Sequence, residues 1–397
     1  MNNFPKLFIN ISDLEICLIA GYSDDQSSFE ILEKLILPIE GISENKITNL
    51  DITANLIKKN ILSIEQKVNY TFKDIIKILN NLEISFLNLC GYKKLNGAQI
   101  SKENITYILN SLKSCVDVFE KNKKILHIFN SEYCLDKKKL DNLPIGLFGD
   151  FYSHELSFNL INKNDYKNLK NILSQCNLKT EKILLKSFVQ GVNICEKKDK
   201  DTFFLIEINE NKSKILFFEK SSFKFEQYFE FGTDIILKDI SKITSLKTEI
   251  IKSILKDIDM DKSISEDEVV ASKFFYKENY RKIKKRLIYD ISFARIKEIS
   301  EIIIFQNINF KYFNKIPFNI YLKRTNTLKN FDCFEQIFRA VFAMNDKHNV
   351  ISLDQAPSEK TLISAHKLVH FGWKKEAIPF SETKKSVIAR FFDMFFE

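Results

Sequence analysis

Apolar residues alternate with polar ones, or run together, in several short stretches of the first half of the chain, a spacing typical of strands. A run from Lys6 to Tyr22 is broken at Ser12-Asp13, as a hairpin turn would break it. Residues 85–90 are predicted to form a buried strand. Alternating segments that are also predicted to be strands lie at residues 126–128, 132–135 and 155–160.

Other stretches repeat their apolar residues every three or four positions, the period of a helix with one buried face. The clearest of these, residues 70–82, is predicted to be a helix. Residues 101–120 form another, with Ser101 at the start and Asn104 where a capping box would carry a glutamate. Residues 165–175 and 183–192 are also predicted to be helical.

From Thr202 onward strands and helices mix again. Three strands joined by tight polar turns are predicted at 203–208, 214–219 and 222–231, followed by a helical stretch over 234–257. A short buried strand is predicted at 301–306, and helices at 334–342 and 358–372, the last ended by Gly372. This mixture indicates an α/β or α+β protein with two lobes.

The sharpest cluster of charge is Arg281-Lys282-Ile283-Lys284-Lys285-Arg286. A helical stripe of apolar and aromatic residues crosses it, formed by Tyr276, Tyr280, Ile283 and Leu287. The basic residues are therefore predicted to be the other face of one helix. That face is either a solvated surface, which is the commoner case, or a contact surface for an acidic peptide or a membrane.

The last residues, Lys384 to Glu397, have the pattern of an amphipathic helix. Its apolar side chains share one broad face: Val387, Ile388, Phe391, Phe392, Met394, Phe395 and Phe396. Lys384 and Lys385 stand at its start, and Arg390 lies on the polar arc. Apolar bulk with cations suits a helix that lies on an anionic membrane. The alternative is a helix docked on the protein's own core, although the preceding stretch reads as a polar linker containing Pro379.

Composition describes an ordinary soluble globular protein, with 45% hydrophobic residues, 28% charged residues and a net charge of +8. The 397 residues suffice for about two to four domain-sized units. No apolar run approaches the ~18 residues of a transmembrane helix, and polar residues interrupt the N-terminal stretch, so we expect no signal peptide. The 7 cysteines are scattered without a CxxC pair, as in a cytoplasmic protein with reduced thiols.

Glycine is scarce, with 9 residues in the chain, or about 2% against a usual ~7%. There is no Gly-Gly and no Gly-x-Gly, so every standard glycine-rich phosphate loop is missing. GxSxG, HExxH and kinase signatures are missing too. No metal site is predicted, because the histidines are dispersed and the pair His366 and His370 has no acidic partner between them.

One segment carries a resemblance to a known family. The run Ile125-Leu126-His127-Ile128 is followed by Glu132-Tyr133, an alternating stretch to Asp136, and then Pro144-Ile145-Gly146-Leu147-Phe148-Gly149. This order resembles the signature of FtsA, the bacterial actin-like division protein that tethers FtsZ to the membrane. Residues 170–179, 231–240 and 368–372 resemble further FtsA segments in the same order.

The resemblance implies an α/β protein with the actin-like, ribonuclease H-like fold of two lobes, a small α+β subdomain inserted in the first lobe, and a C-terminal amphipathic helix. The first-lobe core is expected at 1–87, completed by 163–198 and 356–372, with the insertion at 88–162. The second lobe is expected at 199–355, with an outer subdomain at about 245–298. A linker and the membrane-targeting helix are expected at 373–397.

At the nucleotide loops the chain departs from the FtsA pattern. The two phosphate hairpins and the adenosine loop of the family correspond to Asn10-Ile11-Ser12-Asp13, Glu207-Ile208-Asn209-Glu210-Asn211-Lys212 and Phe305-Gln306-Asn307. Side chains replace the family's glycines, and the carboxylates of Asp13 and Glu210 would each repel a triphosphate at ~4 Å by on the order of 1 to 4 kcal/mol. We expect a pseudo-ATPase rather than an enzyme, without a cofactor, although FtsA proteins bind ATP with magnesium.

The resemblance further implies a cell division protein, peripheral to the cytoplasmic side of the inner membrane at the division septum. Its expected partners are FtsZ, later division proteins, the anionic membrane surface and further copies of the chain in filaments, without nucleic acid. The FtsZ tail is expected to contact Arg281, Lys282 and Lys285. The side chains expected to contact the membrane are Lys384, Lys385, Val387, Ile388, Arg390, Phe391, Phe392, Phe395 and Phe396.

Two other functions remain open for an actin-like chain. The scaffold protein of type IV pilus assembly also resembles FtsA, although the pattern from His127 to Gly149 and the terminal helix favour division. A sugar-kinase-like or chaperone-like ATPase is disfavoured by the altered phosphate loops. A neighbouring FtsZ gene would support division, and neighbouring pilus genes would support the scaffold.

Overall fold

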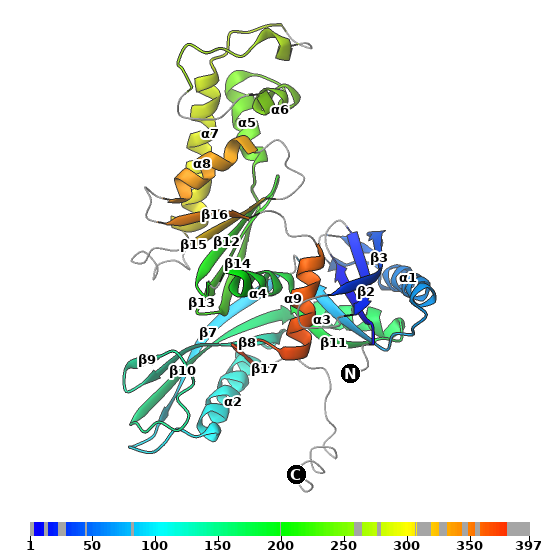
Figure 1. The fold of residues 1–397 in the computed structure, drawn as a ribbon, viewed down its shortest axis with the longest axis vertical. Coiled ribbons are helices and arrows are strands. Elements are labelled where there is room, and N and C mark those ends of the chain that lie inside the picture. The colour runs from blue at the N-terminus through cyan, green and yellow to red at the C-terminus, as the bar shows by residue number, and fades with distance from the viewer. Residues whose placement is uncertain are drawn as a thin grey trace. The chain divides into compact units, whose positions relative to one another are not determined.

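The structure is a computed structural model that describes residues 4–11, 15–22, 29–43, 46–80, 83–198, 200–257, 264–275, 279–305, 307, 319–324, 332–343, 348–353 and 358–378. The chain divides into two compact units (Figure 1). Unit 1 comprises Met1–Asp201, Glu219–Lys224 and Pro357–Glu397. Unit 2 comprises Thr202–Phe218 and Phe225–Ala356.

The first sheet of unit 1 has the strand order β11-β6-β1-β2-β3. Its strands are β1 (Lys6–Ile11), β2 (Glu15–Tyr22), β3 (Glu30–Pro38), β6 (Asp74–Leu79) and β11 (Lys179–Leu185). Helices α1 (Leu50–Val68) and α3 (Lys163–Gln175) pack against one another and add apolar side chains to the core of this sheet. Two short strands, β4 (Ile42–Ser43) and β5 (Lys46–Ile47), pair separately.

The second sheet of unit 1 has the order β17-β8-β10-β7, with β9 paired to β8. Its strands are β7 (Ile84–Lys94), β8 (Lys123–Leu135), β9 (Lys138–Leu140), β10 (Phe151–Asn162) and β17 (Glu376–Ile378). Helix α2 (Lys102–Phe119) buries Ile108, Leu112 and Val116 in a core shared with β8 and β10. Elsewhere in the unit, α4 (Lys186–Lys198) packs against α9 (Ser358–Phe371).

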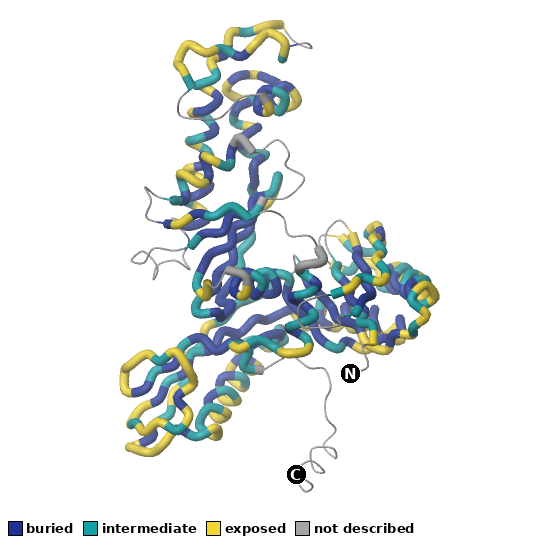
Figure 2. Tube along the Cα trace, viewed as in Figure 1, coloured by how far each residue is buried: buried dark blue, intermediate teal, exposed yellow. Residues whose placement is uncertain are grey.

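Unit 2 is built on a sheet with the order β14-β13-β12-β15-β16. Its strands are β12 (Phe203–Ile208), β13 (Ser213–Glu219), β14 (Ser222–Phe229), β15 (Asn319–Arg324) and β16 (Asn349–Leu353). The helical elements are α5 (Asp234–Thr244), α6 (Thr248–Asp257), η1 (Ser272–Phe275), α7 (Lys285–Ser300), η2 (Glu301–Phe305) and α8 (Asp332–Ala343). Every residue of β12 is buried, as expected for a central strand (Figure 2).

The two five-stranded sheets repeat one topology. In unit 1, β1 pairs antiparallel with β2 and parallel with β6. In unit 2, β12 pairs antiparallel with β13 and parallel with β15. Each sheet thus runs from three strands consecutive in sequence to two that follow later, which agrees with the predicted two lobes of ribonuclease H type.

Several predicted elements are confirmed. The hairpin over residues 6–22 is β1 and β2, and the first three strands of unit 2 are β12, β13 and β14. Helix α2 begins as predicted, because Ser101 Oγ accepts from the Asn104 N–H while Asn104 Oδ1 accepts from the Ser101 N–H. Helix α9 ends at Gly372, whose φ of 68° favours glycine.

Other predictions are wrong. Residues 70–82 are not a helix, since their centre is β6, where Ile75 to Leu79 are all buried. A strand buried on both faces loses its alternation, so the apolar spacing there imitated a helix. Residues 183–185 belong to β11 rather than to the helix that follows. Residues 301–305 continue α7 as a π-helical turn instead of a strand.

Two further segments differ in detail. The helical stretch predicted over 234–257 is interrupted at Ser245, whose φ is 53°. Residues 85–90 do form a strand, but β7 is an edge strand with partly exposed residues. Among the described residues, no helix is both long and apolar enough to cross a membrane. The predicted domain bounds remain predictions.

Candidate functional site

The first phosphate-hairpin segment lies at the end of β1. Asn10 pairs with Cys17 of β2, and its Oδ1 is buried without a hydrogen-bond partner. Ser12 and Asp13 fall outside the described residues. The structure therefore places Asn10 and Ile11 of this hairpin, both on β1.

The carboxylate of Glu207 is held between two lysines from neighbouring strands. Its Oε2 lies 3.1 Å from Lys214 Nζ on β13, and its Oε1 accepts a 2.7 Å hydrogen bond from Lys323 on β15. The three side chains are mostly buried, with exposed fractions of 11%, 5% and 16%. Burial alone would lower the pKa of Lys214, but Glu207, with Tyr228 and Glu226, outweighs it and raises that pKa. The negative charge of Glu207 is thus balanced inside the protein by two lysine side chains.

The turn after β12 closes onto the start of α5. The Asn209 carbonyl accepts from the Thr233 N–H at 3.0 Å, and the Glu210 carbonyl accepts from the Asp234 N–H at 2.9 Å. The contact needs Gly232, because a Cβ there would lie 2.1 Å from the Asn209 oxygen. Helix N-termini bind anions through unpaired N–H groups. Here the first N–H groups of α5 already donate to protein carbonyls.

The adenosine-loop segment is also engaged within unit 2. Asn307 Nδ2 donates to Gln227 Oε1 at 2.8 Å and to the Ile303 carbonyl at 3.1 Å. Asn307 is buried, whereas Gln306 lies outside the described residues. Asn211, on the turn after β12, is exposed.

The basic cluster is not a single helix, which corrects the prediction. Arg281 to Ile283 are non-helical and α7 begins at Lys285, because Lys284 forms a β-bridge with Val269. Ile283, next to this bridge, is buried as part of an extended segment and does not belong to a helical stripe.

The lysines and arginine expected to contact FtsZ differ in their surroundings. Arg281 donates to the Thr244 carbonyl at 3.2 Å and the Ser245 carbonyl at 2.9 Å, at the C-terminal end of α5. Lys285 pairs with Glu268 at 3.0 Å. Lys282 is exposed. Arg281 and Lys285 therefore hold this segment together, and Lys282 is the member most open to a partner.

Part of the segment expected to be a linker is a strand instead. Residues 376–378 form β17 and pair with Phe129 and Ile128 of β8. All residues expected to contact the membrane, from Lys384 to Phe396, lie outside the described part of the chain.

A buried charge cluster that sequence reasoning missed centres on Glu376. Its side chain is 2% exposed, and its Oε1 accepts from His127 Nδ1 at 2.8 Å. Its Oε2 lies 3.3 Å from Lys182 Nζ, which also donates to the Leu368 carbonyl at 3.0 Å. Burial favours a higher pKa for Glu376, but the His127 hydrogen bond and the Lys182 charge outweigh it and lower that pKa. Glu376 is therefore a carboxylate at neutral pH.

The FtsA-like signature residues build the turn that follows β8. Asp136 Oδ1 accepts from the N–H groups of Asp150 and Phe151, at 2.9 and 2.8 Å. Gly149 lies so close to β8 that a Cβ would come within 2.4 Å of Leu135 Cδ1. The spacing from Asp136 to Gly149 in the signature thus follows from the closure of one loop.

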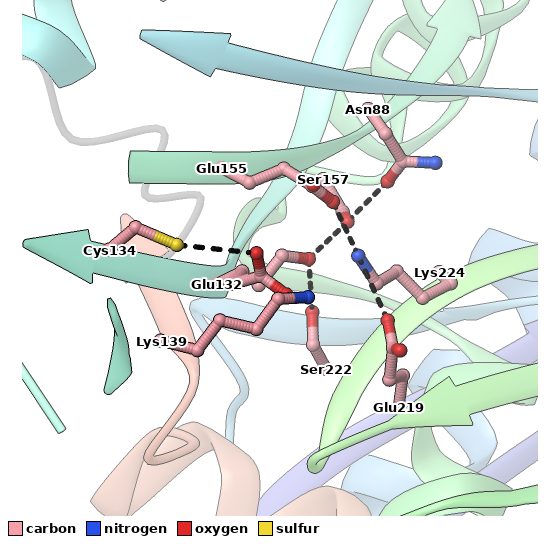
Figure 3. A network of polar contacts seen from close by, with 10 residues as sticks. Asn88, Glu132, Cys134, Lys139, Glu155, Ser157, Glu219, Ser222 and Lys224 are labelled. Carbon is pink, nitrogen blue, oxygen red and sulfur yellow. Dashed lines mark hydrogen bonds and ion pairs between the residues drawn. The ribbon is translucent and has the colours of Figure 1, made fainter. Parts of the chain in front are cut away.

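A second polar network crosses β7, β8 and β10 (Figure 3). Ser131 Oγ on β8 lies 2.8 Å from Ser157 Oγ and 3.2 Å from Ser222 Oγ, and Ser157 donates to Asn88 at 2.5 Å. Lys224 bridges Glu155 at 2.6 Å and Glu219 at 3.3 Å. These contacts tie the turn between β13 and β14 into unit 1.

The thiol in this network is not activated. Burial and the Glu132 carboxylate, 3.4 Å from Cys134 Sγ, raise the pKa of Cys134 (Figure 3). A nucleophilic thiol needs the opposite shift. Among the described residues, no group of three or more His, Cys, Asp and Glu is placed to hold a metal ion.

Comparisons with known proteins agree with the resemblance to FtsA. The chain is 22% identical over 234 residues to the cell division protein FtsA of Buchnera aphidicola subsp. Schizaphis graminum. It is 20% identical over 241 residues to FtsA of Neisseria meningitidis serogroup B. These matches cover 59% and 60% of this chain and 56% and 57% of the relatives. The matched region therefore spans a little over half the length of each relative. No family model matches.

Among solved structures, the chain is similar to one in the PilM-PilN type IV pilus biogenesis complex, with a TM-score of 0.50 and 10% identity. That similarity covers 93% of this chain and 97% of the other, and it bears on the fold alone. With the repeated sheet topology, it confirms the predicted actin-like fold class. The chain thus has an actin-like fold and a divergent sequence that is similar to FtsA proteins.

Proposed function

We propose that this chain is a cell division protein of FtsA type that tethers FtsZ filaments to the cytoplasmic face of the inner membrane. The observation that carries the proposal is its sequence similarity to several FtsA proteins. The FtsA-like signature forms a continuous structural feature, β8 and its following loop. Later division proteins and further copies of the chain are the other proposed partners.

The terminal segment supplies the proposed membrane contact. Its phenylalanines and Lys384, Lys385 and Arg390 suit a surface-lying helix. Phe391→Asp should release the protein from anionic vesicles in a sedimentation assay while leaving its thermal unfolding unchanged. Phe119→Asp is the matched control, since Phe119 is 83% exposed on α2. Unfolding by Phe391→Asp would instead favour a helix docked on the core.

The exposed Lys282 is the residue best suited to test an FtsZ contact. Lys282→Glu should weaken binding of an FtsZ C-terminal tail peptide and reduce its dependence on salt. Lys242→Glu, at another exposed lysine of unit 2, is the control. Equal affinities for Lys282→Glu and the wild type would remove Lys282 from the interface.

The nucleotide segments support a pseudo-ATPase. The two carboxylate oxygens of Glu207 contact two lysines. Carbonyls of the turn 209–212 accept hydrogen bonds from the first N–H groups of α5, and Asn307 is hydrogen-bonded within unit 2. These residues do not fit an ATP–magnesium group. We expect no hydrolysis, and weak or absent ATP binding when it is measured by calorimetry with magnesium. Binding at micromolar affinity would contradict this expectation.

An actin-like scaffold for a type IV pilus machinery is the alternative function. It rests on the fold similarity to the PilM-PilN complex. The sequence similarity to FtsA favours division. Comparing the binding of this chain to FtsZ and to a pilus inner-membrane protein of the same organism would decide between the two functions.

A further inference from the structure

The last described residues, 373–378, are fastened to unit 1 by contacts on several sides, and we name them the C-terminal clasp. Trp373 Nε1 donates to the Ser221 carbonyl at 2.8 Å. The Lys375 carbonyl accepts from the Asn130 N–H at 2.7 Å, just before β17 pairs with β8. Glu376 adds the buried contacts with His127 and Lys182. The clasp thus joins β8, β11 and the turn after β13.

The charge cluster, rather than the strand, holds the clasp closed. A three-residue strand on a sheet edge has little stability of its own. By contrast, removing one member of a buried ion pair leaves its partner charged and unsatisfied. Lys182 is 6% exposed at its side chain, so loss of Glu376 would leave its ammonium with the Leu368 carbonyl as its remaining partner among the described residues.

We propose that the clasp holds residues 373–378 against β8, and that opening it lengthens the stretch of chain that can extend between Gly372 and Lys384. The part of this inference that concerns the membrane rests on the proposed function. With the clasp closed, the chain from Ile378 to Lys384 spans at most about 20 Å. With the clasp open back to Gly372, the span to Lys384 is at most about 40 Å. Glu376 is thus a positioning residue that sets how far unit 1 stands from the membrane.

The first test needs no membrane, because Trp373 is the single tryptophan of the chain and lies in the clasp. Glu376→Ala should shift its emission to longer wavelength and increase quenching by acrylamide. Hydrogen exchange of residues 376–378 should accelerate by about a hundredfold or more. Glu33→Ala, which removes a partly exposed glutamate paired with Lys67 at 2.7 Å, is the control and should change neither signal. Unchanged emission and exchange in Glu376→Ala would overturn the clasp.

A second variant guards against general unfolding. Glu376→Gln keeps the shape of the side chain and one of its two acceptor oxygens but removes its charge, so it should give an intermediate effect confined to the clasp. The effects of Glu376→Ala and Lys182→Met should be non-additive in a double-mutant cycle. Additive effects, or faster exchange throughout the sheet of unit 1 in Glu376→Gln, would show that Glu376 has no specific latching role.

The second arm measures reach on vesicles of phosphatidylglycerol and phosphatidylcholine. Energy transfer from a dye on unit 1 to a lipid dye should fall in Glu376→Ala although the bound fraction stays the same. If the wild type does not bind vesicles, the proposed function fails while the solution test of the clasp stands. If Glu376→Ala opens the clasp but leaves energy transfer unchanged, the clasp does not set the reach.

Discussion

Glu207 shows how neighbours decide what one side chain does. The resemblance to FtsA implies that Glu207 opens a phosphate hairpin, whereas in the structure its two carboxylate oxygens contact Lys214 and Lys323. The sequence places Glu207 at the right position, and Lys214 lies nearby in the next strand. Lys323 is 116 residues away and meets Glu207 only through the parallel register of β12 and β15. Such a pairing is invisible before the strand order is known.

Replacing Glu207 should destabilise unit 2 strongly. Glu207→Ala leaves two mostly buried lysines without their shared carboxylate, a loss of about 3 to 5 kcal/mol. Hydrogen exchange of β12 and β13 measures the change. Glu230→Ala is the control, because Glu230 pairs with Lys212 but its side chain is 78% exposed, and its loss should cost less than about 1 kcal/mol. Equal losses in the two variants would contradict the buried-cluster account.

His154 should make unit 1 sensitive to mild acid. It is fully buried, its Nε2 lies 3.0 Å from Asn130 Oδ1, and burial with the Lys375 charge lowers the pKa of His154 to about 4. The unfolded chain has a histidine pKa near ~6.5 and so binds the proton first as pH falls. Stability from this group is present above about pH 6.5 and is lost toward pH 4.

The size of that effect follows from linkage. The shift corresponds to roughly 3 kcal/mol at full protonation. His154→Asn should flatten the fall in unfolding free energy between pH 6.5 and 4, measured by denaturant titration. The same change at the exposed His370 should keep most of the slope. An unaltered slope in His154→Asn would exclude a neutral buried His154.

At the scale of elements, local sequence signals are sufficient to predict a helix where one face is buried and a capping residue is present. Helix α2 has both, and its start at Ser101 was predicted. Strand β6 has the spacing of a helix because it is buried on both faces. The residues before α7 also have a helical pattern, but they are extended because Lys284 pairs with Val269. Strand β17 escaped detection because three residues carry no period. In each case a tertiary contact outweighs the local pattern.

The capping box of α2 offers a local test. Ser101→Ala removes the side-chain oxygen that accepts from Asn104 and should cost about 1 kcal/mol. Ser111→Ala, at an exposed position in the middle of the same helix, should be neutral or slightly stabilising. Thermal unfolding of the two variants gives the comparison. If the two substitutions have the same effect, Ser101 does not act as a cap.

At the scale of the whole molecule, the chain carries one sheet topology twice without a residue-level repeat. Sequence patterns alone gave a mixed α/β protein of two lobes, and the FtsA-like signature gave the actin-like fold. The sequence did not reveal β17 and its buried Glu376, because both lie in the segment that was predicted to be a linker. The described part of unit 1 therefore extends to Ile378, into the segment that was expected to be a linker.

The central claim is that the terminal segment makes this chain a membrane tether for FtsZ. The most direct measurement is co-sedimentation of FtsZ with anionic vesicles, using the full chain and a truncation to residues 1–378, which keeps the clasp. We predict that FtsZ sediments with the vesicles when the full chain is present and stays in solution with the truncation. Equal recruitment of FtsZ by both proteins, or none by the full chain, would contradict the account.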